Sequence, residues 1–189
     1  MLDALLQLDQ KLFLYLNGLG SPAWDGFWMA VTNKFTAIPL YFLLLVVSYR
    51  FFGLKKTLWL CLAIALMITV TDQLSNFFKL GVQRLRPCHE LSLQPAMRLV
   101  KGYCGGKFGY YSAHASNSMA VAFFFTVLLG KNYRLAGPLL ILWALAVAYS
   151  RIYIGVHYPL DVVSGALAGL LIGWLFARLY TLALKRFRL

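Results

Sequence analysis

Charged residues are scarce in this sequence of 189 residues: only 13% are Asp, Glu, Lys or Arg, and six of those are acidic. Hydrophobic residues make up 61% of the chain and aromatic residues 16%. A chain with so little charge cannot cover a folded core with polar side chains, so an ordinary soluble domain is excluded. The length allows one domain, residues 1–189, and the lipid bilayer is its expected solvent.

The sequence also lacks a concentrated basic surface, although its net charge is +12. The basic residues occur in short clusters between long apolar runs, and for this reason we expect no binding to nucleic acid. The beginning of the chain has no basic stretch followed by a short apolar run and a small-residue cleavage site. This absence predicts that no signal peptide is removed.

Long apolar segments are what the sequence does contain. A helical crossing of the hydrocarbon needs roughly 20 mostly apolar residues, because no water is present there to satisfy the backbone polar groups. We expect five crossings, at residues 36–52, 57–78, 113–129, 135–149 and 158–184. Together they form a transmembrane core, residues 36–184, of an all-α integral membrane helical bundle.

The N-terminal segment, residues 1–34, has a different pattern. Leucines recur near helical spacing with polar residues between them, which is typical of an amphipathic helix at the membrane interface. Trp24, Phe27 and Trp28 follow a Gly/Pro break, and aromatic rings are favoured at headgroup depth. Residues 27–31 also allow the start of a sixth crossing, so the prediction is five to six transmembrane helices.

Charge predicts the orientation of the bundle. Threading five helices through the membrane brings Lys55, Lys56, Lys131–Arg134 and Arg178–Arg188 to one side, while all six acidic residues fall on the other half. Positive loops stay in the cytoplasm. We therefore expect the acidic half to face outward, away from the cytoplasm.

Three polar clusters border the predicted crossings on this outer half. They comprise residues 79–87, 111–114 and 150–161. Lys79, Arg86 and Arg151 converging in a partly dry site would neutralise a dianionic phosphate, to which Arg donates paired hydrogen bonds. The clusters therefore indicate a phosphate site at the outer face.

Two histidines in these clusters, His114 and His157, supply a nucleophile and an acid for attack on phosphorus. Asp161 lies four residues after His157, so the two side chains share a face if the segment is helical. A carboxylate in that position would hold one ring nitrogen protonated and leave the other free to attack, as in hydrolytic triads.

Asp72 lies inside the second predicted crossing, on one helical face with Asn76 and Lys79. An intramembrane carboxylate normally needs a partner, so we expect it to give structural support, bracing Lys79 or bonding to Ser116 or Asn117.

Other basic residues of the outer half match no motif and are predicted to be interfacial anchors: Arg84, Arg98, Lys101 and Lys107. In the last crossing, glycines spaced by four favour close helix packing: Gly165, Gly169 and Gly173.

The three clusters resemble the signature of the type 2 phosphatidic acid phosphatase family. Its pattern is Lys, six residues, Arg-Pro; then Pro-Ser-Gly-His; then Ser-Arg, five residues, His, three residues, Asp. Residues 79–87 and 150–161 fit without a mismatch, and the resemblance covers roughly residues 57–175. In the middle cluster Tyr111 stands where Pro is usual and Ala113 where Gly is usual.

The resemblance implies a role for each motif residue. His157 is the nucleophile and forms a phosphohistidine, Asp161 orients it, and His114 protonates the leaving group. The implied phosphate-binding residues are Lys79, Arg86, Ser112, Ala113 and Arg151. The methyl group of Ala113 preserves the backbone N–H that contacts phosphate if the local dihedral angles suit a residue with a β-carbon. No metal and no cofactor are implied.

The expected function is therefore a membrane lipid phosphate or diphosphate phosphatase, with a lipid in the bilayer as its partner. We expect it in a bacterial inner membrane, with the active site at the extracytoplasmic face, toward the periplasm. Among the substrates of the family we rank undecaprenyl diphosphate first, lipid A 1-phosphate second, and phosphatidylglycerol phosphate or phosphatidate third. Two alternatives stay open. One is a lipid phosphotransferase that uses the same phosphohistidine, and the other is a non-enzymatic anion or lipid transporter.

The three cysteines support the assignment of the outer face. Cys88 and Cys104 lie in one long outer loop, whereas Cys61 lies inside a predicted crossing. An oxidising compartment lets cysteines of one loop pair, so we predict a Cys88–Cys104 disulfide. Closing a loop of this size stabilises a fold by about 3 kcal/mol on the chain-entropy model.

Overall fold

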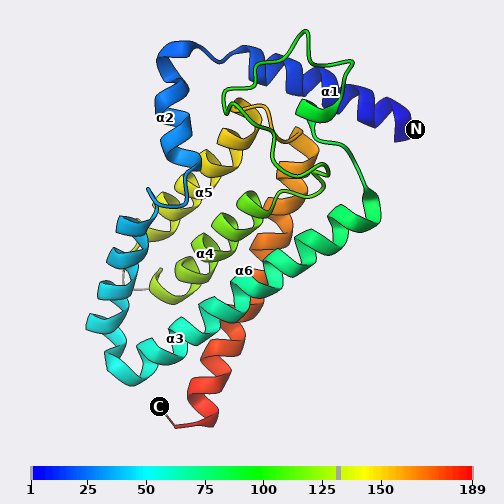
Figure 1. Ribbon diagram of the computed structural model, residues 1–189. Coiled ribbons are helices and arrows are strands. Elements are labelled where there is room, and N and C mark those ends of the chain that lie inside the picture. The colour runs from blue at the N-terminus through cyan, green and yellow to red at the C-terminus, as the bar shows by residue number, and fades with distance from the viewer. Residues whose placement is uncertain (1, 131–132, 189) are drawn as a thin grey trace.

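The computed structural model describes residues 2–130 and 133–188, which form six α-helices (Figure 1). These are α1 (Leu2–Gly18), α2 (Pro22–Thr32), α3 (Ile38–Val82), α4 (Ala113–Leu129), α5 (Ala136–Tyr153) and α6 (Pro159–Arg186). A short 3-10 turn, Pro87–His89, follows α3, and the bridge between Leu85 and Phe108 is the only β-type pairing within the described residues. The all-α fold class is confirmed.

Helix α3 is bent at Gly53, which has φ 74° and ψ 175°. A positive φ is readily adopted only by glycine, so this residue lets the chain reverse without a long loop. The 45 residues of α3 are therefore two helical segments that run in opposite directions (Figure 1). They correspond to the expected crossings at 36–52 and 57–78.

Three of the described helices are long and apolar enough to cross a membrane: α3, α5 and α6. Helix α4 is equally apolar but has 17 residues, about the shortest length that spans the hydrocarbon. Because α3 is long enough for two crossings, these helices can supply the five that the sequence predicts. Helix α4 begins and ends at the predicted residues 113 and 129, whereas α5 extends four residues beyond the predicted end at Tyr149.

Helix α2 and the first half of α3 contact different parts of α5. The Trp28 ring lies 4.9 Å from Tyr149 and 5.4 Å from Tyr153, and further along Tyr41 of α3 lies 6.0 Å from Trp143. Figure 1 shows α2 and the first half of α3 following one another in the same direction, whereas α1 lies across the end of the bundle. Helix α2 and the first half of α3 thus pack in succession along α5.

Helix α4 lies at the centre of the bundle, in contact with α3, α5 and α6. Ten of its 17 residues are buried, including Met119, Phe124 and Phe125, as expected for a helix that is apolar on all sides. The outer helices expose leucines such as Leu43, Leu62 and Leu171, which suit contact with lipid.

The glycines of α6 allow its backbone to approach α4 closely, as the sequence predicts. A β-carbon added at Gly165 would lie 2.5 Å from the carbonyl oxygen of Ser112, and one added at Gly173 would lie 2.4 Å from that of Ala120. At Gly169 the corresponding distance, to the carbonyl oxygen of Ser116, is 2.1 Å. Side chains at these positions would push α6 away from the central helix.

The loop between α3 and α4 contains the predicted disulfide. Cys88 and Cys104 are bonded, with their Cα atoms 5.8 Å apart, and Cys61 is a free cysteine in α3. The bend at Gly53, next to Lys55 and Lys56, and the end of α6 lie at the end of the bundle away from α1 (Figure 1). Lys131, expected in a second basic loop, lies outside the described residues.

Replacing Gly169 by Ala tests the close packing of α4 and α6. Because the new methyl group meets backbone and not a flexible side chain, we expect Gly169→Ala to destabilise the protein by about 1–3 kcal/mol. Gly26→Ala in α2 is the matched control, because a β-carbon there meets nothing within 4 Å. Thermal unfolding in detergent should show a lowered midpoint for Gly169→Ala alone. Equal midpoints for the two variants would contradict this packing.

Candidate active site

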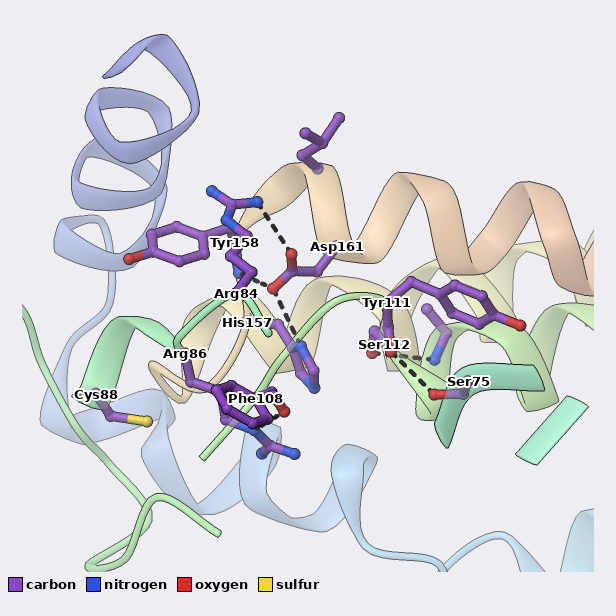
Figure 2. A network of polar contacts seen from close by, with 12 residues as sticks. Ser75, Arg84, Arg86, Cys88, Phe108, Tyr111, Ser112, His157, Tyr158 and Asp161 are labelled. Atoms are coloured by element: carbon purple, nitrogen blue, oxygen red, sulfur yellow. Dashed lines mark hydrogen bonds and ion pairs between the residues drawn. The ribbon is translucent and has the colours of Figure 1, made fainter. Parts of the chain in front are cut away.

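The three polar clusters meet at the end of the bundle covered by α1. Lys79 lies in the last turns of α3, and Arg86 lies in the loop that follows. Ser112 precedes α4, and residues 154–158 connect α5 to α6. Figure 2 shows Arg86, Ser112, His157 and Asp161 converging from these separate elements.

Local sequence explains the turn that carries His157. Gly155 has φ +85°, which allows the chain to reverse after α5, and the N–H groups of Val156 and His157 donate to the carbonyl oxygen of Arg151 at 3.1 and 3.2 Å. Pro159 then occupies the first turn of α6, where its missing N–H costs nothing. The Asp161 carboxylate accepts the N–H of Tyr158 at 3.1 Å, a capping contact that fixes the start of α6.

This capping brings Asp161 to His157, as the spacing of four predicts. Asp161 Oδ2 lies 3.4 Å from His157 Nδ1 (Figure 2). His157 is 2% exposed and Asp161 is fully buried. The backbone of Gly109 packs against the pair, since a β-carbon there would lie 3.0 Å from Asp161 Oδ2. The carboxylate and the ring therefore have little freedom to separate.

The surroundings of His157 favour its neutral form. Burial, followed by the positive charges of Arg151, Arg86 and Lys79, lowers the pKa of His157 well below its ordinary value. A neutral ring that keeps its proton on Nδ1, facing Asp161, has an unprotonated Nε2. This is the form that a nucleophilic histidine requires.

The three cations of the motifs have no acidic partner. Within residues 2–130 and 133–188, no carboxylate forms an ion pair with Lys79, Arg86 or Arg151. Arg86 donates instead to the carbonyl oxygens of Phe108 at 3.2 Å and Cys104 at 3.1 Å. Unpaired cations in a buried setting are costly, and a bound anion would offset that cost.

Arg151 is the most buried of these cations, at 5% exposed. Its Nη1 donates to the hydroxyl of Thr32 in α2, and among the described residues its Nε has no hydrogen-bond partner. Sequence motifs alone did not indicate Thr32. A buried guanidinium with an unused donor is suited to binding an oxyanion.

The N-terminus of α4 adds donors to the same site. Ser112 caps the helix, with Oγ accepting the N–H of Ala115 at 3.5 Å, and its own N–H donates to the carbonyl oxygen of Asp161 at 3.0 Å. The N–H groups of Ala113 and His114 belong to the first turn and have no acceptor within the helix. Ala113 has no positive φ, so its methyl group leaves this anion-binding arrangement of amides intact.

His114 lies on the exposed side of this helix terminus. It lines a cavity of about 270 Å³ together with Asp72, Lys34 and Thr32. Because Thr32 also contacts Arg151, this cavity adjoins the guanidinium of Arg151. His114 and Thr32, the hydrogen-bond partner of Arg151, therefore line the same cavity.

Asp72 braces α3 against α4, in one of the ways that the sequence predicts. Its Oδ1 accepts from Asn117 Nδ2 at 2.8 Å. One turn further along α3, the hydroxyl of Ser75 donates to the carbonyl oxygen of Tyr111 at 3.0 Å (Figure 2). Tyr111, which replaces the usual proline, is buried, and its ring packs 5.5 Å from that of Phe78.

The prediction that Arg84 and Arg98 are interfacial anchors was wrong. Arg84 pairs with Asp161 at 3.0 Å and with Asp9 at 2.6 Å, and Arg98 pairs with Asp25 at 2.9 Å. Asp9 is 75 residues from Arg84 in the chain, so no local pattern connects them. One sequence signal was available. The chain contains only six acidic residues, so a carboxylate near a polar cluster is expected to pair with an Arg of that cluster.

Comparison with known proteins agrees with this geometry. The family profile of the PAP2 superfamily matches residues 56–185. The chain is 40% identical to a lipid A 4'-phosphatase of Bacteroides thetaiotaomicron over 178 residues, which are 93% of this chain and 78% of the relative. It is 33% identical to a lipid A 4'-phosphatase of Porphyromonas gingivalis over 189 residues, which are 98% of this chain and 78% of the relative.

A solved structure supports the same assignment. The crystal structure of Aquifex aeolicus LpxE superimposes with a TM-score of 0.65 at 27% identity, covering 89% of this chain and 93% of that one. Shorter matches to undecaprenyl-diphosphatases, a putative one among them, cover 23% and 35% of this chain. The motif geometry, the family profile and these relatives together show that the chain belongs to the PAP2 superfamily and is a membrane-embedded phosphatase.

Proposed function

We propose that this protein hydrolyses a phosphate monoester of a lipid A-type glycolipid through a phosphohistidine on His157. The observation that carries the proposal is a buried His157 whose pKa is lowered by burial and by three nearby cations, for which the described residues provide no acidic partner. The names of the two relatives that match over more than nine-tenths of this chain favour a lipid A phosphate over undecaprenyl diphosphate, which the sequence ranking put first. The matches to undecaprenyl-diphosphatases are confined to shorter segments.

In the first step the cations bind the phosphate of the lipid, helped by the N–H groups at the start of α4. His157 Nε2 attacks phosphorus, and the bond between phosphorus and the lipid oxygen breaks. His114 donates a proton to that oxygen, so the products are a lipid alcohol and a phosphohistidine. Asp161 keeps the His157 proton on Nδ1 and stabilises the positive charge that develops on the ring.

In the second step a water molecule attacks the phosphohistidine. His114, now neutral, accepts a proton from this water while the bond between phosphorus and Nε2 breaks. The electron pair returns to Nε2, and inorganic phosphate leaves. The same three cations hold the transferring group in both steps, where positioned positive charge lowers the barrier. Asp72 has a supporting role, since it contacts Asn117 and pairs with none of the cations.

We further propose that the site faces the periplasm from a bacterial inner membrane. The bend of α3, which Lys55 and Lys56 follow in the sequence, lies at the end of the bundle opposite α1, as does the end of α6, which contains Lys185 and Arg186 and is followed by Arg188. Positive loops stay in the cytoplasm. The disulfide next to the site agrees with an oxidising compartment.

Replacing His157 by Asn tests the nucleophile. The amide keeps a similar size and polarity but cannot form the phosphoenzyme, so we expect kcat for phosphate release to fall by about 10⁴-fold or more. His89→Asn is the matched control, because His89 only contacts the carbonyl oxygen of Gly105 at 3.3 Å in the loop. Phosphate release from a lipid A substrate in detergent is the measurement. Near-normal turnover by folded His157→Asn protein would refute the nucleophile assignment.

A panel of lipid phosphates tests the substrate class. We expect kcat/KM to be highest for lipid A bearing a 4'-phosphate, and lower for undecaprenyl diphosphate, phosphatidylglycerol phosphate and phosphatidate. Inorganic phosphate and the dephosphorylated lipid should appear in equal amounts, whereas a phosphotransferase would release less phosphate than lipid alcohol when a second lipid is supplied. Faster turnover of undecaprenyl diphosphate would reverse the assignment, and no release from any lipid would refute phosphatase activity.

A further inference from the structure

Helix α1 contributes a buried carboxylate to the surroundings of the site. Asp9 is 6% exposed, although α1 lies across the end of the bundle (Figure 1). Its Oδ2 accepts from Arg84 Nη2 at 2.6 Å, and its Oδ1 accepts the N–H of Leu160, in the first turn of α6, at 2.9 Å. Asp9 therefore contacts both the partner of Asp161 and the helix that carries Asp161.

Arg84 connects this carboxylate to Asp161. Its Nη1 donates to Asp161 Oδ1 at 3.0 Å, and the guanidinium lies 4.0 Å from the centre of the Tyr158 ring (Figure 2). The planar guanidinium can hold one carboxylate on each Nη atom, which the single ammonium of Lys cannot do with the same geometry. The two oxygens of Asp161 are thus divided: Oδ1 faces Arg84 and Oδ2 faces Tyr158 N–H and His157.

The charges of this chain explain why a second carboxylate matters. Alone, Arg84 would neutralise the charge of Asp161 and weaken its hold on the Nδ1 proton of His157. With Asp9 on its other side, Arg84 divides its charge between two carboxylates, and the cluster of three groups has a net charge of −1. Asp161 Oδ2 then remains a strong acceptor toward His157 in a site that otherwise contains cations.

We propose that Asp9 is a positioning residue of this enzyme, acting through Arg84 and Asp161 to keep the reactive nitrogen of His157 unprotonated and oriented. The proposal rests on the proposed role of His157 as nucleophile. Asp9 touches neither His157 nor the motif cations, so its effect is on the chemical step and not on phosphate binding.

Docking of α1 does not depend on Asp9 alone. Asn17, fully buried near the end of α1, donates to the carbonyl oxygens of Ile152 at 3.1 Å and Tyr153 at 2.8 Å, and its Oδ1 accepts the N–H of Arg98 at 2.7 Å. A change at Asp9 that preserves its shape should therefore leave α1 in place. A loss of activity in such a variant would then report an electrostatic role of Asp9, because α1 is still docked.

Asp9→Asn is the central variant of the test, with Asp3→Asn as its control. Asp3 lies on the same helix and is exposed, so its variant removes the same charge without touching the cluster. With a lipid A phosphate as substrate, we expect Asp9→Asn to lower kcat on the order of 10-fold per folded protein, as changes to orienting partners commonly do. KM should change by less than about twofold, because binding of the phosphate is unaltered. Asp3→Asn should match the unmodified protein in both constants.

A double-variant cycle tests whether Asp9 acts through Arg84. Arg84→Gln removes the charge between the two carboxylates and should lower kcat at least as much as Asp9→Asn. The kcat of the double variant should be no lower than that of Arg84→Gln alone, because without Arg84 the side chain at position 9 no longer affects Asp161. This cycle also covers the case in which Asp9→Asn fails to fold alone: Arg84→Gln must then still lower kcat at unchanged KM.

The outcomes separate this proposal from the proposed function. Unchanged kcat for folded Asp9→Asn protein, or multiplicative losses in the double variant, overturns the role of Asp9 while the nucleophile assignment stands. A raised KM at normal kcat also overturns it, because it would place Asp9 in substrate binding. An unmodified protein that releases no phosphate, or an active His157→Asn variant, instead overturns the proposed function.

Discussion

Positive charge without an acidic partner is the constraint on which the active site depends. Lys79, Arg86 and Arg151 lie at the end of an apolar bundle, and no carboxylate in the described parts of the chain pairs with them. Without a bound anion, these unpaired cations lower the stability of the fold. A bound anion would offset that cost. The same charges, together with burial, lower the pKa of His157 and keep the ring neutral.

The acidic residues near the site form ion pairs with arginines outside the three motif cations. Arg84 holds Asp9 and Asp161, and Arg98 holds Asp25. Without Arg84, the buried Asp161 carboxylate would lose its cationic partner, and its orientation toward His157 would no longer be fixed from that side. Arg84 therefore contributes to the site by holding both carboxylates and by orienting Asp161.

Packing of the helices sets the geometry of these groups. The glycines of α6 bring its backbone against α4, and a backbone hydrogen bond of 3.0 Å joins Ser112 to Asp161 at the start of both helices. This bond places the first turn of α4 beside the first turn of α6, which directly follows His157. Gly155 fits beneath the 97–98 loop, since a β-carbon there would lie 2.4 Å from the carbonyl oxygen of Arg98. Small residues at close approaches are what hold the reactive groups in position.

Local patterns predicted the parts of this structure that depend on residues close in sequence. The spacing of four between His157 and Asp161, the start of α4 at Ala113 and the disulfide of one loop are of this kind. The contacts of Asp9 with Arg84 and of Thr32 with Arg151 were not predictable, because their partners are 75 and 119 residues apart and belong to no periodic pattern. The contact of Trp28 in α2 with Tyr149 in α5 was not predictable for the same reason.

The central claim is that the phosphoryl group passes through His157. The most direct measurement is rapid alkaline quenching during turnover of a labelled lipid phosphate, followed by peptide mass spectrometry, because phosphohistidine is stable in base. We expect one phosphoryl group on the peptide that contains His157, formed and lost at rates that match steady-state turnover. Turnover with the label on a different side chain, or with no covalent label at any time point, would contradict this account.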